Sequence, residues 1–267
     1  MSRSFDRLTK ILIRLRSRRG GCPWDLKQTP DSLKPFLIEE AYEVIEAIES
    51  KDNARVIEEL GDLLYQVLFH AQIARERGRF TIRDVLKATA DKMVRRHPHV
   101  FGRDRGARRG RTAAEVLVRW EELKAEEKGN RHRTSVLDGI PKQLPALLRA
   151  QQLQARAARV GFDWPAIEPV LKKVREELRE FEEARKSRSK IRMEEELGDV
   201  LFALVNLARF LKINAEDALR KTSQRFIQRF QYIEQAAAKK RRPVQDLSLS
   251  EMDRLWEEAK QLPGNSR

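Results

Sequence analysis

The chain of 267 residues carries the same pattern of acidic residues twice, and this duplication limits the folds it can adopt. Each copy has the order E-x-x-E followed by E-x-x-D. The first copy consists of Glu40, Glu43, Glu59 and Asp62. The second copy, 137 residues later, consists of Glu177, Glu180, Glu196 and Asp199. A period this long indicates two duplicated domains rather than a solenoid of short repeats.

The boundary between the two domains is expected where turn-forming residues gather. Gly129, Gly139, Pro141 and Pro145 fall in one short stretch. We therefore predict an N-terminal domain at 1–130, a linker at 131–145 and a C-terminal domain at 146–267. The N-terminal domain should contain a basic first helix and a mobile, Gly/Arg-rich loop at 102–111.

Apolar residues recur with helical period in both halves, and no strand pattern stands out, so the fold class predicted is all-α. In the first half, Thr29-Pro30 reads as the start of a helix, which a polar break at 50–53 separates from a second helix that ends at Gly78. Further helices are expected at 82–94 and about 113–128, and at about 215–238 in the second half. The inward residues of the first pair are expected to be Leu37, Ile38, Ala41, Val44, Ile45, Ile48, Leu60, Leu63, Leu64, Val67, Leu68 and Ala71. Their expected counterparts are Leu171, Val174, Leu178, Phe181, Leu197, Val200, Leu201, Leu204, Val205 and Ala208.

The second of these helices in the C-terminal half is apolar on nearly every side. Such a helix should be covered by its neighbours or by another subunit.

The repeated acids suit a metal site. Residues three apart lie on one helix face, so the two pairs of each copy can converge beside the seam of two antiparallel helices. Glu39, Glu46 and Glu58 should instead face water. Close carboxylates repel one another unless a cation lies among them, and an oxygen-only set favours Mg²⁺ or Mn²⁺. Because Mg²⁺ commonly takes its remaining ligands from substrate phosphates, this arrangement points to phosphate chemistry.

An ordinary solvated helix face is the alternative for any single E-x-x-E motif in a chain with 36% charged residues. The repetition of two facing pairs at a fixed offset favours the metal site. Gly61 and Gly198 occupy equivalent places within the helices. Since a helical Gly costs about 1 kcal/mol relative to Ala, its presence in both copies suggests close helix approach or room for a ligand.

The net charge of +14 invites a nucleic-acid hypothesis. No zinc-finger spacing or RNA-recognition motif accompanies the charge, so we expect at most weak, non-specific binding of nucleic acid. No apolar run is long enough to span a membrane. The single cysteine, Cys22, fits a reducing compartment and hence the cytoplasm. An organelle-targeting peptide is an alternative reading of the Arg-rich start, which is otherwise a first helix.

Several motifs together resemble the MazG family. They are Gly-Cys-Pro-Trp-Asp at 21–25, Leu-Ile-Glu-Glu-Ala-Tyr-Glu-Val at 37–44, Glu-Leu-Gly-Asp at 59–62, Arg-Arg-His-Pro-His-Val-Phe at 95–101, Ser-Val-Leu-Asp-Gly-Ile-Pro at 135–141 and Val-Gly-Phe-Asp-Trp at 160–164. The resemblance covers almost the whole chain in the correct order. It implies a homodimer of tandem helical domains in the all-α NTP pyrophosphatase superfamily.

The resemblance also implies Mg²⁺-dependent hydrolysis of nucleoside triphosphates to the monophosphate and diphosphate, with broad choice of base. The C-terminal copy of the acids is the one that the family associates with hydrolysis. The substrate-binding positions implied there are Lys173, Arg225, Arg229 and Trp256. Arg225 stands where the family usually has Lys, and Ser223 where it usually has Asn, which puts the placement of the substrate in doubt. The first half has Phe36 at the position of Lys173, so the C-terminal site is favoured as the main catalyst.

Other functions stay open at this point. A non-enzymatic, basic helical regulator that binds nucleotide or nucleic acid is the main alternative. A pure assembly module is disfavoured by the repeated acids, and an enzyme narrowly specific for dUTP or a damaged nucleotide remains possible. Glu176 and Glu195 are candidate general bases between which the sequence does not choose.

Overall fold

The computed structural model describes residues 3–101 and 135–262, together with six single positions between them at 112, 115, 116, 119, 120 and 123. Every regular element in these ranges is a helix, which confirms the all-α prediction. The chain divides into two compact units, residues 1–131 and 132–267. No helix of the described residues has the length and apolarity that crossing a membrane would need.

Several expectations concern residues outside this description. These are the loop at 102–111, most of the helix at about 113–128, and the first four residues of the linker predicted at 131–145. The rest of that linker is described, and it consists mainly of turns before the next helix.

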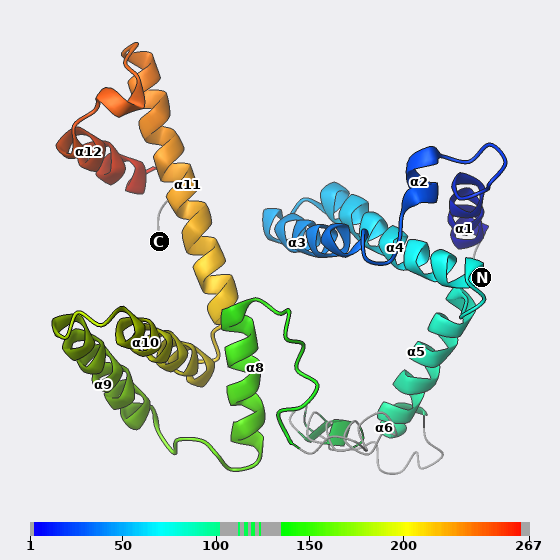
Figure 1. Ribbon diagram of the computed structural model, residues 1–267, viewed down its shortest axis with the longest axis horizontal. Coiled ribbons are helices and arrows are strands. Elements are labelled where there is room, and N and C mark those ends of the chain that lie inside the picture. Colours follow the sequence, from blue (N-terminus) through cyan, green and yellow to red (C-terminus); the bar gives the residue numbers. More distant parts are fainter. Residues whose placement is uncertain are drawn as a thin grey trace. The chain divides into compact units, whose positions relative to one another are not determined.

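The first unit is built around a helical hairpin (Figure 1). Its elements are α1 (Arg3–Leu15), α2 (Pro23–Lys27), α3 (Lys34–Ser50), α4 (Asn53–Glu76), α5 (Ile82–Arg96) and α6 (Pro98–Phe101). α3 packs along α4, and α1 packs on the later part of α4. The core between them consists of Leu12, Leu33, Leu68, Phe69 and Ile73.

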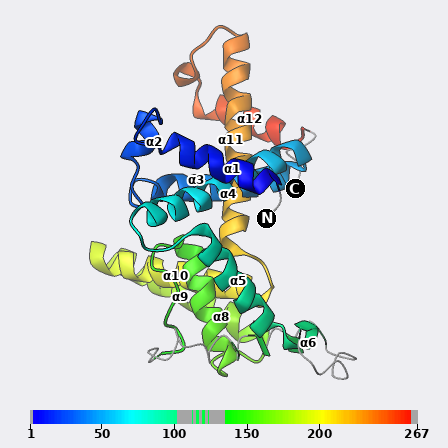
Figure 2. The ribbon, with the colours of Figure 1, turned by 90° about the vertical axis from the view of Figure 1, so that its right-hand side faces the viewer.

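The second unit contains a similar hairpin and an additional arm. Its elements are α8 (Ala146–Arg159), α9 (Ile167–Lys186), α10 (Lys190–Phe210), α11 (Ala215–Lys239), a short 3₁₀ helix η3 (Val244–Asp246) and α12 (Leu249–Lys260). α9 packs along α10, and α8 packs against α10. α12 folds back onto α11, and both views show the two helices side by side (Figures 1 and 2). The arm has its own small core of Ile233, Ala237, Leu247 and Leu255.

The two hairpins turn in the same way. In the first, Lys51 adopts a left-handed conformation with φ 58°, and the Asp52 side chain accepts a hydrogen bond from the Ala54 amide. In the second, Arg188 has φ 54°, and the Ser189 side chain accepts from the Arg192 amide. A left-handed residue ends one helix, and the residue after it caps the next. In each hairpin, therefore, the same type of turn brings the E-x-x-E pair of one helix close to the E-x-x-D pair of the next.

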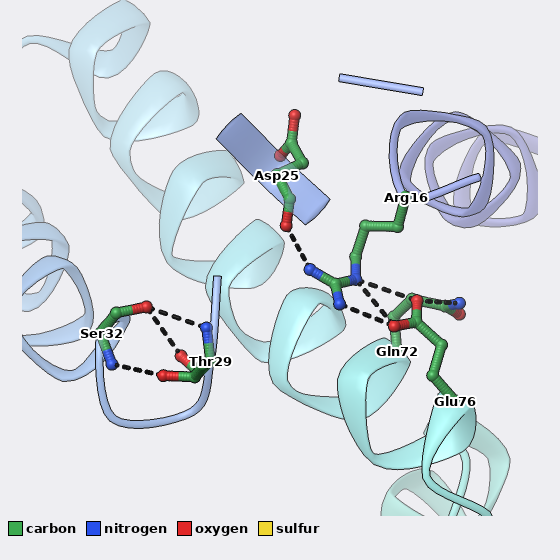
Figure 3. A network of polar contacts seen from close by, with 6 residues as sticks. All are labelled: Arg16, Asp25, Thr29, Ser32, Gln72 and Glu76. Carbon is green, nitrogen blue, oxygen red and sulfur yellow. Dashed lines mark hydrogen bonds and ion pairs between the residues drawn. The ribbon is translucent and has the colours of Figure 1, made fainter. Parts of the chain in front are cut away.

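The start of α3 differs from the prediction. The chain does not enter a helix at Pro30, because Thr29 and Ser32 close a turn of their own. The Thr29 amide donates to Ser32 Oγ at 2.9 Å, and the Ser32 amide donates to Thr29 Oγ1 at 3.1 Å (Figure 3). The helix begins only at Lys34, with Pro35 in its first turn, where proline is tolerated.

Arg16 links α1, α2 and α4 (Figure 3). It is 9% exposed, and its Nε and Nη2 donate to the two carboxylate oxygens of Glu76 at 2.9 and 2.6 Å. Its Nη1 donates to the backbone oxygen of Asp25. The guanidinium also lies 5.3 Å from the ring centre of Phe69. A buried guanidinium with this many partners fixes the three helices against one another.

The predicted inward faces are partly wrong. Ile38, Ile45 and Ile48 are 55%, 39% and 57% exposed, whereas Val44 and Ala47 are buried. The other predicted core residues that are exposed in the chain are Leu60, Leu64, Val67, Leu178, Leu197, Leu201 and Leu204. The physical reason is that these helices are apolar on two faces, and the described residues of their own unit cover only one of them.

Candidate metal and substrate site

The second hairpin brings acids from two helices together. Carboxylate oxygens of Glu177 on α9 and of Glu196 and Asp199 on α10 all lie within 4.8 Å of one another. Glu177 is only 6% exposed, and Asp199 is exposed. Glu180, the fourth predicted ligand, lies outside this group. Burial and the neighbouring Glu177 carboxylate nevertheless raise the pKa of Glu180, and Glu196 contributes to the same shift, so Glu180 interacts electrostatically with the group.

Lys173 lies one helical turn before Glu177 and binds the buried acid. Its Nζ lies 2.6 Å from Glu177 Oε1 and 2.8 Å from Glu176 Oε1. The hydrogen bonds to Glu176 and Glu177 raise the pKa of Lys173 above its ordinary value, and Lys173 in turn lowers the pKa of Glu176. The ammonium group therefore stays charged beside the acids.

The two candidate general bases differ in their surroundings. Glu176 is half-buried and accepts the hydrogen bond from Lys173. Glu195 is exposed on α10. The residues expected to face water behave as predicted, since Glu39, Glu46 and Glu58 are all exposed.

The first hairpin holds a similar group of acids with a different partner. Oxygens of Glu40, Glu43 and Glu59 lie within 4.8 Å of one another, and Asp62 lies outside the group. No lysine is available at position 36; instead Gln66 Nε2 donates to Glu40 Oε1 at 3.2 Å. Phe36 there packs edge-on against Trp24, with ring centres 5.9 Å apart.

The first group of acids is also electrostatically unfavourable on its own. Burial raises the pKa of Glu43 and of Glu59, and nearby carboxylates raise both further. Asp62, although outside the group, also contributes to the raised pKa of Glu43. Clustered carboxylates with raised pKa values fit a hard divalent cation, which would remove their mutual repulsion. Both hairpins therefore have donor sets that suit Mg²⁺.

Among the described residues, no other helix packs against Gly61 or Gly198. A Cβ added at either residue would meet no atom within 4 Å. Close helix approach within the chain, one of the two reasons expected for these glycines, is therefore not observed.

A cavity of about 540 Å³ adjoins the acids of the second hairpin. Lys173, Glu177 and Asp199 form one side of its lining. The rest of the lining comes from Leu137, Leu153, Gln154, Ala157, Gly161, Phe162, Asp163, Trp164, Phe202, Ala203, Asn206 and Arg209. A largely apolar cavity of this size beside charged groups is typical of a small-molecule site.

Three of the implied substrate-binding residues lie elsewhere in the second unit. The guanidinium of Arg229 is 5.5 Å from the ring centre of Trp256, and the ring of Phe226 is 5.2 Å from the same Trp256 ring. Arg225 donates from Nη2 to Thr222 Oγ1 at 2.7 Å. All these residues lie on α11 or α12, and Arg225, Arg229 and Trp256 are not among the described residues that line the cavity. The structure thus brings Lys173 to the acids but leaves the other three on the arm.

A family model described as the MazG nucleotide pyrophosphohydrolase domain matches residues 28–101 and again residues 166–233. These two segments make up more than half of the chain. The chain belongs to the MazG family. Each matched segment contains one hairpin with its four acids, so the two halves are two MazG domains.

Curated relatives agree with this assignment. The chain is 47% identical over 256 residues to the nucleoside triphosphate pyrophosphohydrolase/pyrophosphatase MazG of Thermotoga maritima, covering 96% of this chain and 95% of that protein. It is 45% identical over 258 residues to the nucleoside triphosphate pyrophosphohydrolase of Escherichia coli K12, covering 96% and 97%. It is also 50% identical to the uncharacterized protein YabN of Bacillus subtilis, of which it covers 52%.

The MazG-like motif at 160–164 supplies Gly161, Phe162, Asp163 and Trp164 to the lining of the cavity, but the motif alone did not reveal the cavity. Gln154, Phe202 and Asn206 carry no metal-binding or catalytic pattern, and they come from two different helices. One signal was present in the repeat itself. Ala203 and Asn206 stand where the first MazG domain has Gln66 and Phe69, a change toward smaller or more polar side chains.

Proposed function

We propose that the protein is a Mg²⁺-dependent nucleoside triphosphate pyrophosphohydrolase, with Mn²⁺ as a possible substitute. It would convert ribo- and deoxyribonucleoside triphosphates to the monophosphate and diphosphate, with broad choice of base. The names of the Thermotoga and Escherichia relatives support the reaction. The observation that carries the proposal is the Lys173–Glu177 contact of 2.6 Å at the edge of the cavity.

The second MazG domain is the proposed main catalyst. It combines three features that the first lacks at equivalent positions: a lysine on the buried acid, a small Ala203 and a polar Asn206. The first domain keeps the acids Glu40, Glu43, Glu59 and Asp62, and we propose that it binds a cation without being the main catalytic site.

The mechanism follows from the charges. Glu177, Glu180, Glu196 and Asp199 would hold Mg²⁺, which when bound neutralises phosphate charge and polarises a phosphoryl oxygen. A water oxygen bonds to the α-phosphorus while the bond from that phosphorus to the α–β bridging oxygen breaks, and diphosphate leaves with the negative charge on that oxygen. The proton that the water loses passes to a carboxylate, for which Glu176 and Glu195 are the candidates. Lys173 lies where it can stabilise that charge as it develops.

Arg225, Arg229 and Trp256 are proposed to extend the substrate-binding surface from the α11–α12 arm. Because they do not line the cavity of their own chain among the described residues, the proposal assigns them to a homodimer in which the arm of one copy reaches the site of the other. We place the protein in the cytoplasm, since its single cysteine excludes an internal disulfide.

Diphosphate release from ATP, GTP, CTP, UTP and the matching deoxynucleotides tests the proposal. We compare the wild type with Asp199→Asn and with Asp62→Asn, the matched variant in the first domain. Asp199→Asn should reduce hydrolysis by about 100-fold or more, because it removes one of the carboxylates proposed to hold Mg²⁺ at the phosphates. Asp62→Asn should leave the rate within about 3-fold, and a chelator should abolish activity of the wild type.

Two results would contradict the proposal. One is full activity of a folded Asp199→Asn protein. The other is the absence of diphosphate release under any nucleotide and metal, combined with steeply salt-dependent binding of DNA or RNA. The second result would favour the basic, non-enzymatic regulator.

A further inference from the structure

The first domain contains a cleft whose described lining includes none of the repeated acids. The cleft has a volume of about 610 Å³ and lies where α1, the end of α4 and the start of α5 meet (Figure 1). Leu12 and Leu68, each 1% exposed, form part of its apolar floor. A cleft of several hundred Å³ with an apolar floor has the size and character of a small-molecule site.

Three cations surround the apolar floor, one from each helix. They are Lys10 on α1, Arg75 on α4 and Arg83 on α5, and all three are exposed. Asp6 is the single acid among the described residues of the lining. None of the three cations forms an ion pair with a described residue. Cations gathered over an apolar wall of low dielectric concentrate anions from solution, so the cleft favours a negatively charged ligand.

The acids that directly follow the two arginines in the chain are engaged elsewhere. Glu76 accepts hydrogen bonds from Arg16 Nε and Nη2, at 2.9 and 2.6 Å. Asp84 accepts from the amide and the hydroxyl of Thr81, at 2.8 and 2.7 Å, and so caps α5. Because these carboxylates already have partners, they do not neutralise the cations of the cleft.

The second domain has the equivalent corner closed. By their order around the hairpin, α8, α10 and α11 correspond to α1, α4 and α5. Gln151 Nε2 on α8 donates to the Ile213 oxygen at 2.9 Å, and the Ala215 amide of α11 donates to Gln151 Oε1 at 3.0 Å. The Leu148 amide donates to Glu216 Oε2 at 3.3 Å. In the first domain, by contrast, no hydrogen bond between described residues joins α1 to the first turn of α5.

The helix caps allow the two corners to be compared residue by residue. Thr81 is the N-cap of α5, and Asn214 is the N-cap of α11. Arg83 stands two residues after the first cap, and Glu216 stands two residues after the second. The closed corner thus has an acid at the place where the open corner has a cation. The cationic cleft is therefore a property of the first domain and not a general consequence of the duplicated fold.

We propose that this cleft binds an organic phosphate of nucleotide size. Lys10, Arg75 and Arg83 hold its phosphate groups, and the apolar floor contacts the rest of the molecule. Arginine presents N–H groups in a planar fork that matches phosphate oxygens, and lysine adds a compact charge. An inorganic phosphate would use the cations but leave the apolar floor uncovered. This site is separate from the proposed hydrolytic site, since its cations come from the first domain and it requires no metal.

Calorimetry in EDTA tests this binding without metal and without turnover. We titrate the full chain with ATP, and with inorganic triphosphate as the ligand that lacks an organic part. Without divalent cations the repeated acids repel phosphate, whereas the cleft attracts it. The wild type should bind ATP at least about 5-fold more tightly than triphosphate, because only ATP covers the apolar floor. Arg75→Gln and Arg83→Gln should each raise the Kd of ATP by about 5–10-fold, because a charge-assisted contact with phosphate is lost.

The controls separate the cleft from the general charge of the protein. Arg79→Gln removes an exposed cation from the turn between α4 and α5, at a residue outside the described lining, and should leave the Kd of ATP unchanged. Lys173→Met, in the second domain, should also leave it unchanged. Lys10→Gln provides a third reading at another exposed side chain, so the test does not depend on the folding of one variant.

Five results would overturn the proposed site. They are no binding of ATP to the wild type in EDTA, an unchanged Kd in the folded cleft variants, an equal loss in Arg79→Gln, a loss confined to Lys173→Met, and equal Kd values for ATP and triphosphate. The third would indicate attraction by net charge alone, and the fifth a site for phosphate alone. None of these results bears on hydrolysis, which Asp199→Asn tests separately.

Discussion

At the scale of single residues, the difference between Lys173 and Phe36 is the clearest functional asymmetry between the two domains. Each occupies the position one helical turn before the first glutamate of its acid pair, which is the buried Glu177 in one domain and the half-buried Glu40 in the other. The lysine side chain is charged, whereas the phenylalanine side chain is an apolar ring. The lysine contacts Glu177, whereas the phenylalanine packs against Trp24. Both domains thus have the repeated acids, but only the second has a lysine beside them.

Lys173→Met should reduce diphosphate release by at least about 10-fold, because the charge that would stabilise the leaving diphosphate is lost. Lys172→Met, at the exposed neighbouring residue, is the matched control and should behave like the wild type. Steady-state rates with ATP and saturating Mg²⁺ measure the effect. Equal rates for the two variants would show that the charge of Lys173 does not contribute to hydrolysis.

At the scale of the helices, the sequence predicted element type well and helix rotation less well. The hairpins were expected from the helical period and the polar break, and both are present. The inward face was not determined, because Ile38 and Ile45 lie on one apolar face of α3 while Val44 and Ala47 lie on another. Periodicity reveals that a helix has apolar faces, but only packing decides which of them its own chain covers.

The acids of the site could be predicted from the sequence, whereas the cavity beside them could not. Acids repeated at fixed spacing stand out in one dimension, and in each copy three of the four lie together. Gln154 and Asn206 lie on different helices and became recognisable only once α8 and α10 were packed together. The motif at 160–164 contributes one part of this pocket, whereas the side chains that come from separate helices form no pattern in the sequence.

The capping of α12 gives a prediction for this element. Glu251 accepts hydrogen bonds from Arg242 and from the Ser248 amide, both at 2.8 Å, and these contacts lower its pKa to about 2. A lowered pKa in the folded state means that the carboxylate stabilises the arm above its ordinary pKa, and that this contribution is lost as pH falls toward 2. Glu251→Gln should therefore lower the melting temperature at pH 7 and have no effect near pH 2.

Circular dichroism melts at pH 7, 5 and 3 would follow this loss. Glu234→Gln, at an exposed position of α11, serves as the control and should track the wild type throughout. A difference between Glu251→Gln and the wild type that stays constant down to pH 3 would show that the charge of Glu251 does not cap the helix.

At the scale of the whole molecule, each domain exposes an apolar face that the described residues of that domain do not cover. In the first domain the exposed residues on α3 and α4 include Ile38, Ile45, Ile48, Ile57, Leu60 and Leu64. In the second domain those on α9 and α10 include Leu178, Leu197, Leu201 and Leu204. Contiguous apolar surface of this kind marks a protein–protein interface or an aggregation hazard. A homodimer would cover the faces and supply the arm residues that the catalytic site lacks.

Sedimentation tests this assembly. The molecular mass of the wild type measured by sedimentation should be twice the chain mass of 31.2 kDa. Ile45→Glu should lower the measured mass toward that of the monomer, because a buried, unpaired carboxylate at the interface is strongly unfavourable. Glu46→Gln, on the exposed polar side of α3, is the control and should stay dimeric. If the arm acts across the dimer, loss of assembly in Ile45→Glu should also reduce hydrolysis, although Ile45 lies outside the domain proposed as the main catalyst. A wild type that remains monomeric at all concentrations would require the arm residues to act within their own chain or not at all.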